Sequence, residues 1–129
     1  MKFTSKHIQM INEGIDSFNG FQYDIAHTIW EQVWKEMRTN DNRYCLKGLI
    51  QISGSYLKCY FKKGDASEYL LRRAKINIYK YISELNQFIE SDSLITDIDL
   101  LLKNKITIKV FHKVQIKKRG RLHNDLGTR

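Results

Sequence analysis

The sequence predicts an all-α protein, a compact bundle of about five antiparallel helices with an extended basic arm at its C-terminal end. Two observations predict the bundle: apolar residues recur at helical spacing from residue 4 to residue 102, and proline is absent from the 129 residues. The charge predicts the arm, because residues 1–102 carry equal numbers of acidic and basic side chains and the net charge of +8 lies in the last 27 residues. We therefore expect a helical domain at 1–104 and the arm at 105–129.

The first two predicted helices span residues 4–19 and 24–38. Thr4 or Ser5 can cap the first helix, and Asn19-Gly20 supplies the left-handed residue that ends it. The apolar face of this helix consists of Ile8, Ile11, Ile15 and Phe18. The second helix has a wider apolar stripe, made of Ile25, Ala26, Ile29, Trp30, Val33, Trp34 and Met37. A stripe of this width predicts that the second helix packs against more than one neighbour.

The third and fourth predicted helices span residues 42–63 and 65–89. The third contains Gly48 and Gly54, and since glycine inside a helix costs about 1 kcal/mol relative to alanine, we expect another helix backbone to pass close to it. It is predicted to bury Cys45, Leu49, Ile52, Tyr56 and Tyr60. The segment 65–68, Asp-Ala-Ser-Glu, has the spacing of a capping box and predicts the start of the fourth helix.

A fifth helix is predicted from a cap at Ser91 or Ser93 to about Asn104, with acidic residues early and lysines late, as the helix dipole favours. Beyond it the apolar residues alternate with polar ones over 106–116, which is the pattern of a strand. A lone strand has no partner in a helical domain. Three arrangements therefore stay open: pairing with another protein, an extended path over the bundle, or a continued helix. We expect the residues from 117 onward to be flexible.

The composition excludes a membrane-spanning helix, because no run of about 18 apolar residues occurs. Residues 1–19 include two acidic side chains and lack the uninterrupted apolar stretch of a secretory signal. Cys45 and Cys59 fall on apolar helical positions and are predicted to be buried free thiols. Free thiols indicate an intracellular, reducing compartment, either the cytoplasm or an organelle matrix such as the plastid stroma.

Unusual residues gather in three segments between positions 18 and 51: Phe-Asn-Gly at 18–20, Tyr-Asp-Ile-Ala-His-Thr-Ile-Trp-Glu-Gln-Val-Trp at 23–34, and Gly-Leu-Ile-Gln at 48–51. Their pattern resembles domain-of-unknown-function family 309, over roughly residues 14–82. The resemblance implies a compact all-α domain and brings no established activity. This chain departs from the family pattern at Thr28, where a glutamate is usual, and at Lys58, near a frequent histidine. Gly20 also stands one residue early.

His27 and Glu31 are four residues apart and therefore neighbours on one helical face. One hypothesis is a buried structural network that locks two helices together, formed by His27, Trp30, Glu31, Trp34, Gly48 and Gln51. The other is a ligand pocket or a metal-assisted hydrolase, in which His27 and Glu31 act and Gln51 orients. A metal site normally takes at least three protein ligands and only two are offered here, so we expect no metal and no cofactor.

The cations of the arm have the chemistry that phosphate backbones require. The candidate contact residues are Lys109, Lys113, Lys117, Lys118, Arg119 and Arg121. We expect a non-enzymatic binding or assembly module whose residues 106–129 contact RNA, a ribonucleoprotein or a partner protein. The alternative for these residues is an inert solubilising tail. The tryptophans and tyrosines would allow a homodimer through a helix face. Removal of the arm is expected to abolish binding and leave the fold intact.

Overall fold

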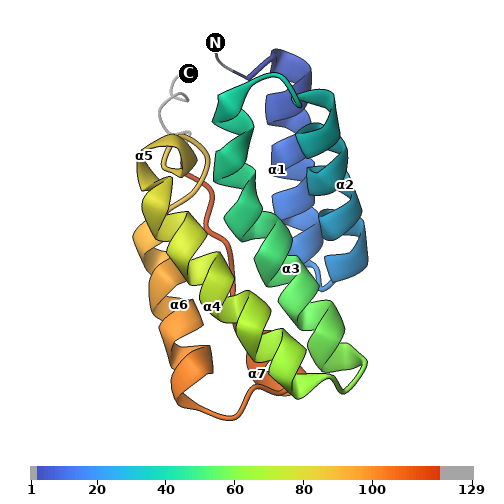
Figure 1. The fold of residues 1–129 in the computed structure, drawn as a ribbon, viewed down its shortest axis with the longest axis vertical. Helices are drawn as coiled ribbons and strands as arrows, with labels where there is room; N and C mark the ends of the chain where they lie inside the picture. The colour runs from blue at the N-terminus through green and yellow to red at the C-terminus, as the bar shows by residue number, and fades with distance from the viewer. Residues whose placement is uncertain (1–2, 120–129) are drawn as a thin grey trace.

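The computed structural model describes residues 3–119, and the all-α fold class predicted from the sequence is confirmed (Figure 1). The elements in chain order are α1 (Ser5–Asn19), α2 (Tyr23–Glu36), the 3₁₀ helix η1 (Asp41–Leu46), α3 (Lys47–Tyr60), α4 (Gly64–Lys80), α5 (Ile82–Leu85), α6 (Ser91–Lys103) and α7 (Ile108–Phe111).

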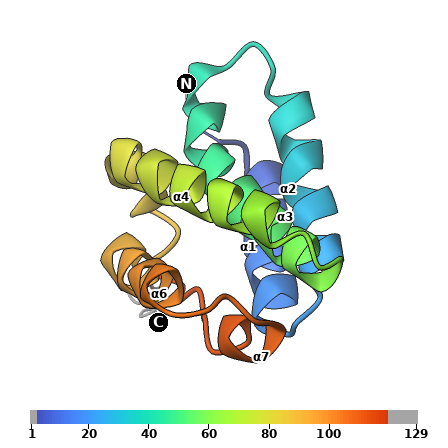
Figure 2. The same cartoon turned by 60° about the horizontal axis from the view of Figure 1, so that its bottom comes forward.

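The long helices pack in the spatial order α6, α4, α3, α2 and α1, each against the next. Neighbouring helices run in alternating directions in Figure 1, so the predicted antiparallel arrangement is present. Figure 2 brings the lower end of Figure 1 forward and shows α7 between α6 and α1. The C-terminal segment, residues 104–119, therefore closes the gap between the two outermost long helices.

Several helix ends differ from the expectation. The side chain of Thr4 caps α1 as predicted, since its hydroxyl accepts from the backbone N–H of His7 at 3.1 Å. The left-handed residue after α1 is Phe21, with φ of 67°, while Gly20 has φ of −91°. The expectation for Gly20 was therefore wrong. The Phe21 ring stacks on His112 at 4.3 Å between ring centroids, and this contact holds the residue in its unfavourable backbone conformation.

The third and fourth helices are each divided. The predicted first turns of the third helix form η1, whose start is capped by the side chain of Asn40 accepting from the N–H of Asn42. The fourth helix breaks at Tyr81, whose φ of −112° and ψ of 31° are not helical. The predicted caps of α4 and α6 were wrong, because α4 begins at Gly64 and places Asp65 inside its first turn, and α6 begins at Ser91.

The closest approach between two helices is that of α3 and α4 at Gly48. A Cβ atom at Gly48 would overlap the side chain of Ile78 and lie 3.2 Å from the carbonyl oxygen of Ala74. The expected close approach is therefore confirmed at this glycine. At Gly54 it was wrong, because a Cβ there would lie 3.5 Å from its nearest neighbours, an ordinary contact distance.

The C-terminal segment is anchored in the core through Phe111, Val114 and Ile116, which are 0–2% exposed. Residues 108–111 form α7, and the chain then runs extended along the bundle towards α5, drawn in red in Figure 1. Its backbone bonds to the loop before α6, where the N–H of Glu90 donates to the carbonyl of Lys117 at 2.9 Å. Of the three arrangements left open by the sequence, the extended path over the bundle applies to this stretch.

The anchoring of the C-terminal segment corrects two expectations for the arm, its removal without loss of the fold and its flexibility. Deletion of residues 106–129 would remove three buried side chains, so the expectation that the fold survives this deletion was wrong. The flexibility expected from residue 117 onward does not apply to residues 117–119, since the carbonyl of Lys117 and the N–H of Arg119 are hydrogen-bonded to the bundle. Residues 120–129, which include Arg121, lie outside the described residues.

Both cysteines are free thiols. Cys45 is buried as predicted, and burial raises the pKa of its thiol to about 12. Cys59 is only half-buried, with Sγ 3.8 Å from the carbonyl oxygen of Ile106. Among the helices of residues 3–119, none has both the length and the apolar character needed to cross a membrane.

The two glycines of α3 give opposite predictions. Gly48→Ala should lower the free energy of unfolding by about 1–3 kcal/mol, because its methyl group must displace Ile78. Gly54→Ala should leave the free energy of unfolding unchanged or raise it by up to about 1 kcal/mol, because alanine favours the helix and meets no steric conflict. Urea unfolding of both variants measures the difference, and equal effects would contradict the close approach at Gly48.

Candidate functional site

Trp30 fixes α2 against α1. Its indole is fully buried and Nε1 donates to the carbonyl oxygen of Ile11 at 3.2 Å. A Cβ atom at Gly14 would overlap the indole ring, so the glycine leaves the space that the tryptophan fills. This contact explains why a large aromatic residue and a glycine occur on facing helices, and it gives Trp30 a structural role.

Trp34 lies one turn further along α2, half-buried, and makes a separate contact. The guanidinium carbon of Arg43 lies 4.0 Å from the centre of the Trp34 ring, a cation–π arrangement. The ring also meets the edge of Tyr44 at 5.3 Å between centroids. Trp34 therefore holds η1 on α2, and it does not cover the histidine of the motif.

The structure brings His27 and Glu31 together at the surface, where α2 meets α3. Nε2 of His27 lies 3.4 Å from Oε2 of Glu31, and the side chains are 24% and 46% exposed. Nδ1 of His27 lies 2.8 Å from Oγ of Ser53 and 3.1 Å from the carbonyl oxygen of Ile50. Nδ1 therefore faces α3, and Nε2 is the ring atom left to face Glu31. The expected pair is formed, but the expectation that it is buried was wrong.

Gln51 does not join this pair, which corrects the expected contact with His27. Its Oε1 accepts from Nδ2 of Asn77 on α4 at 2.7 Å. The reason is helical geometry: successive residues differ by about 100° around the helix axis, so Ile50 and Ser53 face α2 while Gln51 faces α4. Gln51 and Gly48 therefore both belong to the contact between α3 and α4.

The predicted network of six residues is thus divided among separate contacts. His27 and Glu31 link α2 to α3, Trp30 links α2 to α1, Trp34 holds η1, and the remaining two residues face α4. Within residues 3–119, no group of three or more His, Cys, Asp or Glu side chains is placed to hold a metal ion.

The lysines of the C-terminal segment all lie at the surface. Residues 105, 109, 113 and 117 are lysines at intervals of four, and each is exposed. Between them lie the buried side chains of Phe111, Val114 and Ile116. Burial of these apolar residues therefore holds the lysines outward on a backbone that belongs to the folded body.

The other two described cations of the segment also contact the body. Nζ of Lys118 forms an ion pair with Asp16 on α1 at 2.7 Å. Arg119 donates from Nε to the carbonyl oxygen of Ile89 at 3.4 Å, and its backbone N–H bonds to Phe88. These two residues fasten the end of the segment and also present charge at the surface.

A stack of aromatic rings at the lower end of the bundle was not predicted. Tyr23 and Tyr56 lie 3.8 Å apart between ring centroids, nearly parallel, and His112 lies within 6.0 Å of both. Burial raises the pKa of Tyr23 and of Tyr56. Tyr23 belongs to the predicted motif, but its pairing with α3 and α7 joins residues far apart in the sequence. No local pattern could have indicated it.

Two alanine variants separate the roles of the surface pair. His27→Ala should lower the free energy of unfolding by about 1 kcal/mol, because the bonds of Nδ1 to α3 are lost. Glu31→Ala should change it by less than about 0.5 kcal/mol, because an exposed ion pair contributes little. Urea unfolding measures both, and an equally large loss for Glu31→Ala would favour a buried network instead.

Residues 11–68 match the family model described as Domain of unknown function (DUF309). No curated protein and no solved structure gives a match to the chain. The matched region covers the contacts of Gly14, Trp30 and His27 and ends within α4, so the C-terminal segment lies beyond it. The resemblance to this family predicted from the sequence is therefore confirmed over residues 11–68.

Proposed function

We propose that this protein is a non-enzymatic module that binds RNA through its phosphate backbone, using the lysines of the C-terminal segment. The observation that carries the proposal is the division of this segment into buried apolar and exposed cationic side chains. Lys109, Lys113 and Lys117 form no ion pair with any residue in the described part of the chain. Their charges are therefore free to meet phosphate groups.

The turn between α3 and α4 adds lysines to the end of the molecule where α7 and Lys109 lie, whereas Lys117 lies near α5, where its carbonyl bonds to Glu90. Lys62 and Lys63 are exposed in this turn, which shares the lower end of the bundle with α7 in Figure 1. The nearby acidic residues of the helix starts are Asp24 and Asp65. Asp97 lines the same surface hollow as Lys105 and Lys113. The exposed lysines 62, 63, 105, 109 and 113 outnumber these three carboxylates, which favours a polyanionic partner.

Anchoring of the C-terminal segment by the core also lowers the entropy cost of binding. A free cationic tail loses conformational freedom when it binds, and that loss weakens the complex. The backbone of residues 108–118 is already ordered by α7 and by its bonds to the bundle. The charge pattern of the surface is therefore set before RNA arrives.

The salt dependence of binding tests the proposal. If the unmodified protein engages about five phosphates of single-stranded RNA, the logarithm of its affinity should fall against the logarithm of salt concentration with a slope of about −3.5. Replacing Lys109, Lys113 and Lys117 by alanine should reduce the magnitude of this slope by about 2. Fluorescence anisotropy of a labelled RNA measures both values.

A charge-matched variant is the control. Lys35, Arg38 and Lys80 are exposed cations in or just beyond the last turns of α2 and α4, away from α7, and their replacement by alanine removes the same charge. This control should keep the slope of the unmodified protein. A slope near zero for the unmodified protein, or an equal loss in the control, would contradict the proposal.

A further inference from the structure

We infer that the lower end of the bundle binds a single nucleic-acid strand by stacking its bases on exposed aromatic rings. This inference rests on the proposed function and adds the kind of nucleic acid that the surface fits. The rings are those of Phe21, Tyr60 and Phe61, which we call the aromatic end. They come from two turns of the chain that the fold places beside α7.

The rings of the aromatic end continue an ordered column. Phe21 stacks on His112 at 4.3 Å with an angle of 16° between the ring planes, and the planes of His112 and Tyr23 differ by 4°. Tyr23 stacks on Tyr56, and Tyr56 lies 6.4 Å from Tyr60 at 26°. Phe21 and Tyr60 therefore continue this column through His112 and Tyr56, whereas the ring of Phe61 meets that of Tyr60 edge to face, at 87° and 5.2 Å between centroids.

The outer rings are open to solvent although they are large and apolar. Phe21 is 51% exposed, Tyr60 is 56% exposed and Phe61 is 64% exposed. Phe21 is held exposed in a left-handed backbone conformation that non-glycine residues seldom adopt. Lys62, which directly follows Phe61, also has a left-handed backbone, so both turns that carry these rings follow helix ends of the same kind.

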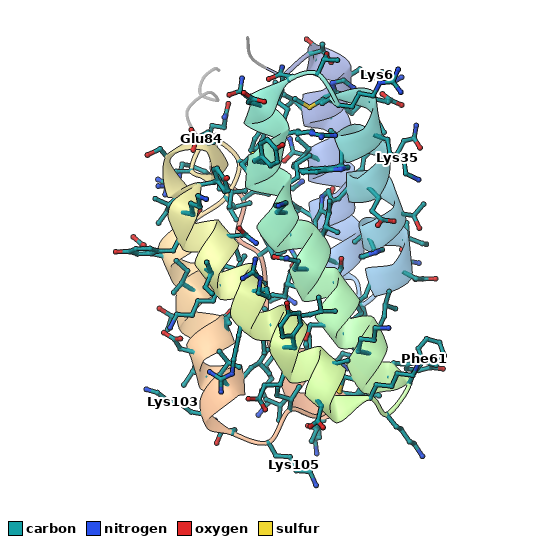
Figure 3. All side chains as sticks on the ribbon, viewed as in Figure 1. Lys6, Lys35, Phe61, Glu84, Lys103 and Lys105 are labelled. Atoms are coloured by element: carbon teal, nitrogen blue, oxygen red, sulfur yellow. The ribbon has the colours of Figure 1, made fainter. Side chains whose placement is uncertain are left out.

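Lysines surround these rings. Lys62 and Lys63 directly follow Phe61, and Lys109 lies on α7, three residues before His112. Figure 3 shows Phe61 and Lys105 at the same end of the molecule. The aromatic end is therefore a group of exposed rings bordered by positive charge.

Aromatic rings beside lysines are the chemistry that binds a single strand, since bases stack on the rings while phosphates meet the cations. A duplex keeps its bases stacked on each other and offers only its backbone to such a surface. The charge therefore attracts any nucleic acid, while the aromatic rings favour an unpaired strand.

Another exposed aromatic residue provides a matched control. Tyr79 is 71% exposed near the far end of α4 and lies beside Ile76, Arg72 and Lys80. Like Tyr60, Tyr79 is an exposed tyrosine at a helix end with lysines nearby. Within the described residues it is not one of the rings of the aromatic column. The same change, tyrosine to leucine, can be made at both positions.

The experiment compares the full-length protein with Tyr60→Leu, Phe21→Asn and Tyr79→Leu. Asparagine suits position 21 because it tolerates the left-handed backbone. Thermal unfolding first establishes that each variant folds. Fluorescence anisotropy then measures binding of a labelled oligouridine of about twelve nucleotides and of a duplex RNA of equal phosphate number.

We expect the unmodified protein to bind oligouridine more tightly than the duplex. Tyr60→Leu and Phe21→Asn should each weaken oligouridine binding by about fivefold or more, with an unchanged salt slope, and should leave duplex binding unchanged. Tyr79→Leu should bind both probes like the unmodified protein. Equal binding of the two probes, unchanged affinity in both aromatic-end variants, or a loss confined to Tyr79→Leu would each overturn the inference.

The variant that lacks Lys109, Lys113 and Lys117 distinguishes a failure of this inference from a failure of the proposed function. If removal of Lys109, Lys113 and Lys117 weakens binding while both aromatic-end variants bind normally, only the stacking of bases is wrong. If the unmodified protein binds neither probe in a salt-dependent way, the proposed function is wrong, and the inference falls with it.

Discussion

The arrangement of the C-terminal segment depends on two hydrogen bonds made by the side-chain amide of Asn19. Nδ2 donates to the carbonyl oxygen of Ile116, and Oδ1 accepts from the backbone N–H of the same residue, both at 2.8 Å. The amide thus pairs with the extended backbone as a neighbouring strand would. These bonds satisfy the backbone N–H and carbonyl groups of Ile116. Burial of the Ile116 side chain would otherwise leave both groups without partners. The same contact ties the end of α1 to the segment, which fixes the positions of its lysines.

The residues that make the sequence recognisable build the scaffold, and the proposed binding chemistry lies beside them. Trp30 and Gly14 join α1 to α2, His27 joins α2 to α3, and Gly48 joins α3 to α4. Each of these contacts uses a residue type that the packing requires at that place. The lysines proposed to bind RNA instead follow the matched region, on a segment that the scaffold anchors.

The sequence was sufficient to predict what depends on helical periodicity. Burial of Ile11, Ile15 and Phe18 on α1, the cap at Thr4 and the close approach at Gly48 follow from local spacing. Ile8, expected on the same face of α1, and Tyr60, expected to be buried on α3, are exposed. The path of residues 106–116 was not predictable, because alternating burial arises equally in a sheet and in an extended segment lying on helices. The partners of Gln51 and Phe21 were also not predictable. They depend on the rotation of α3 and on a contact between two distant turns.

The central claim is that the C-terminal segment belongs to the folded body and holds its lysines in place. Amide hydrogen exchange of Ile116 and Arg119 tests this claim most directly, because their N–H groups bond to Asn19 and to the carbonyl of Phe88. Both amides should exchange far more slowly than in an unstructured peptide, with protection approaching that of the buried helix α3. Exchange at the rate of an unstructured peptide would show that the segment is a free tail and contradict the account.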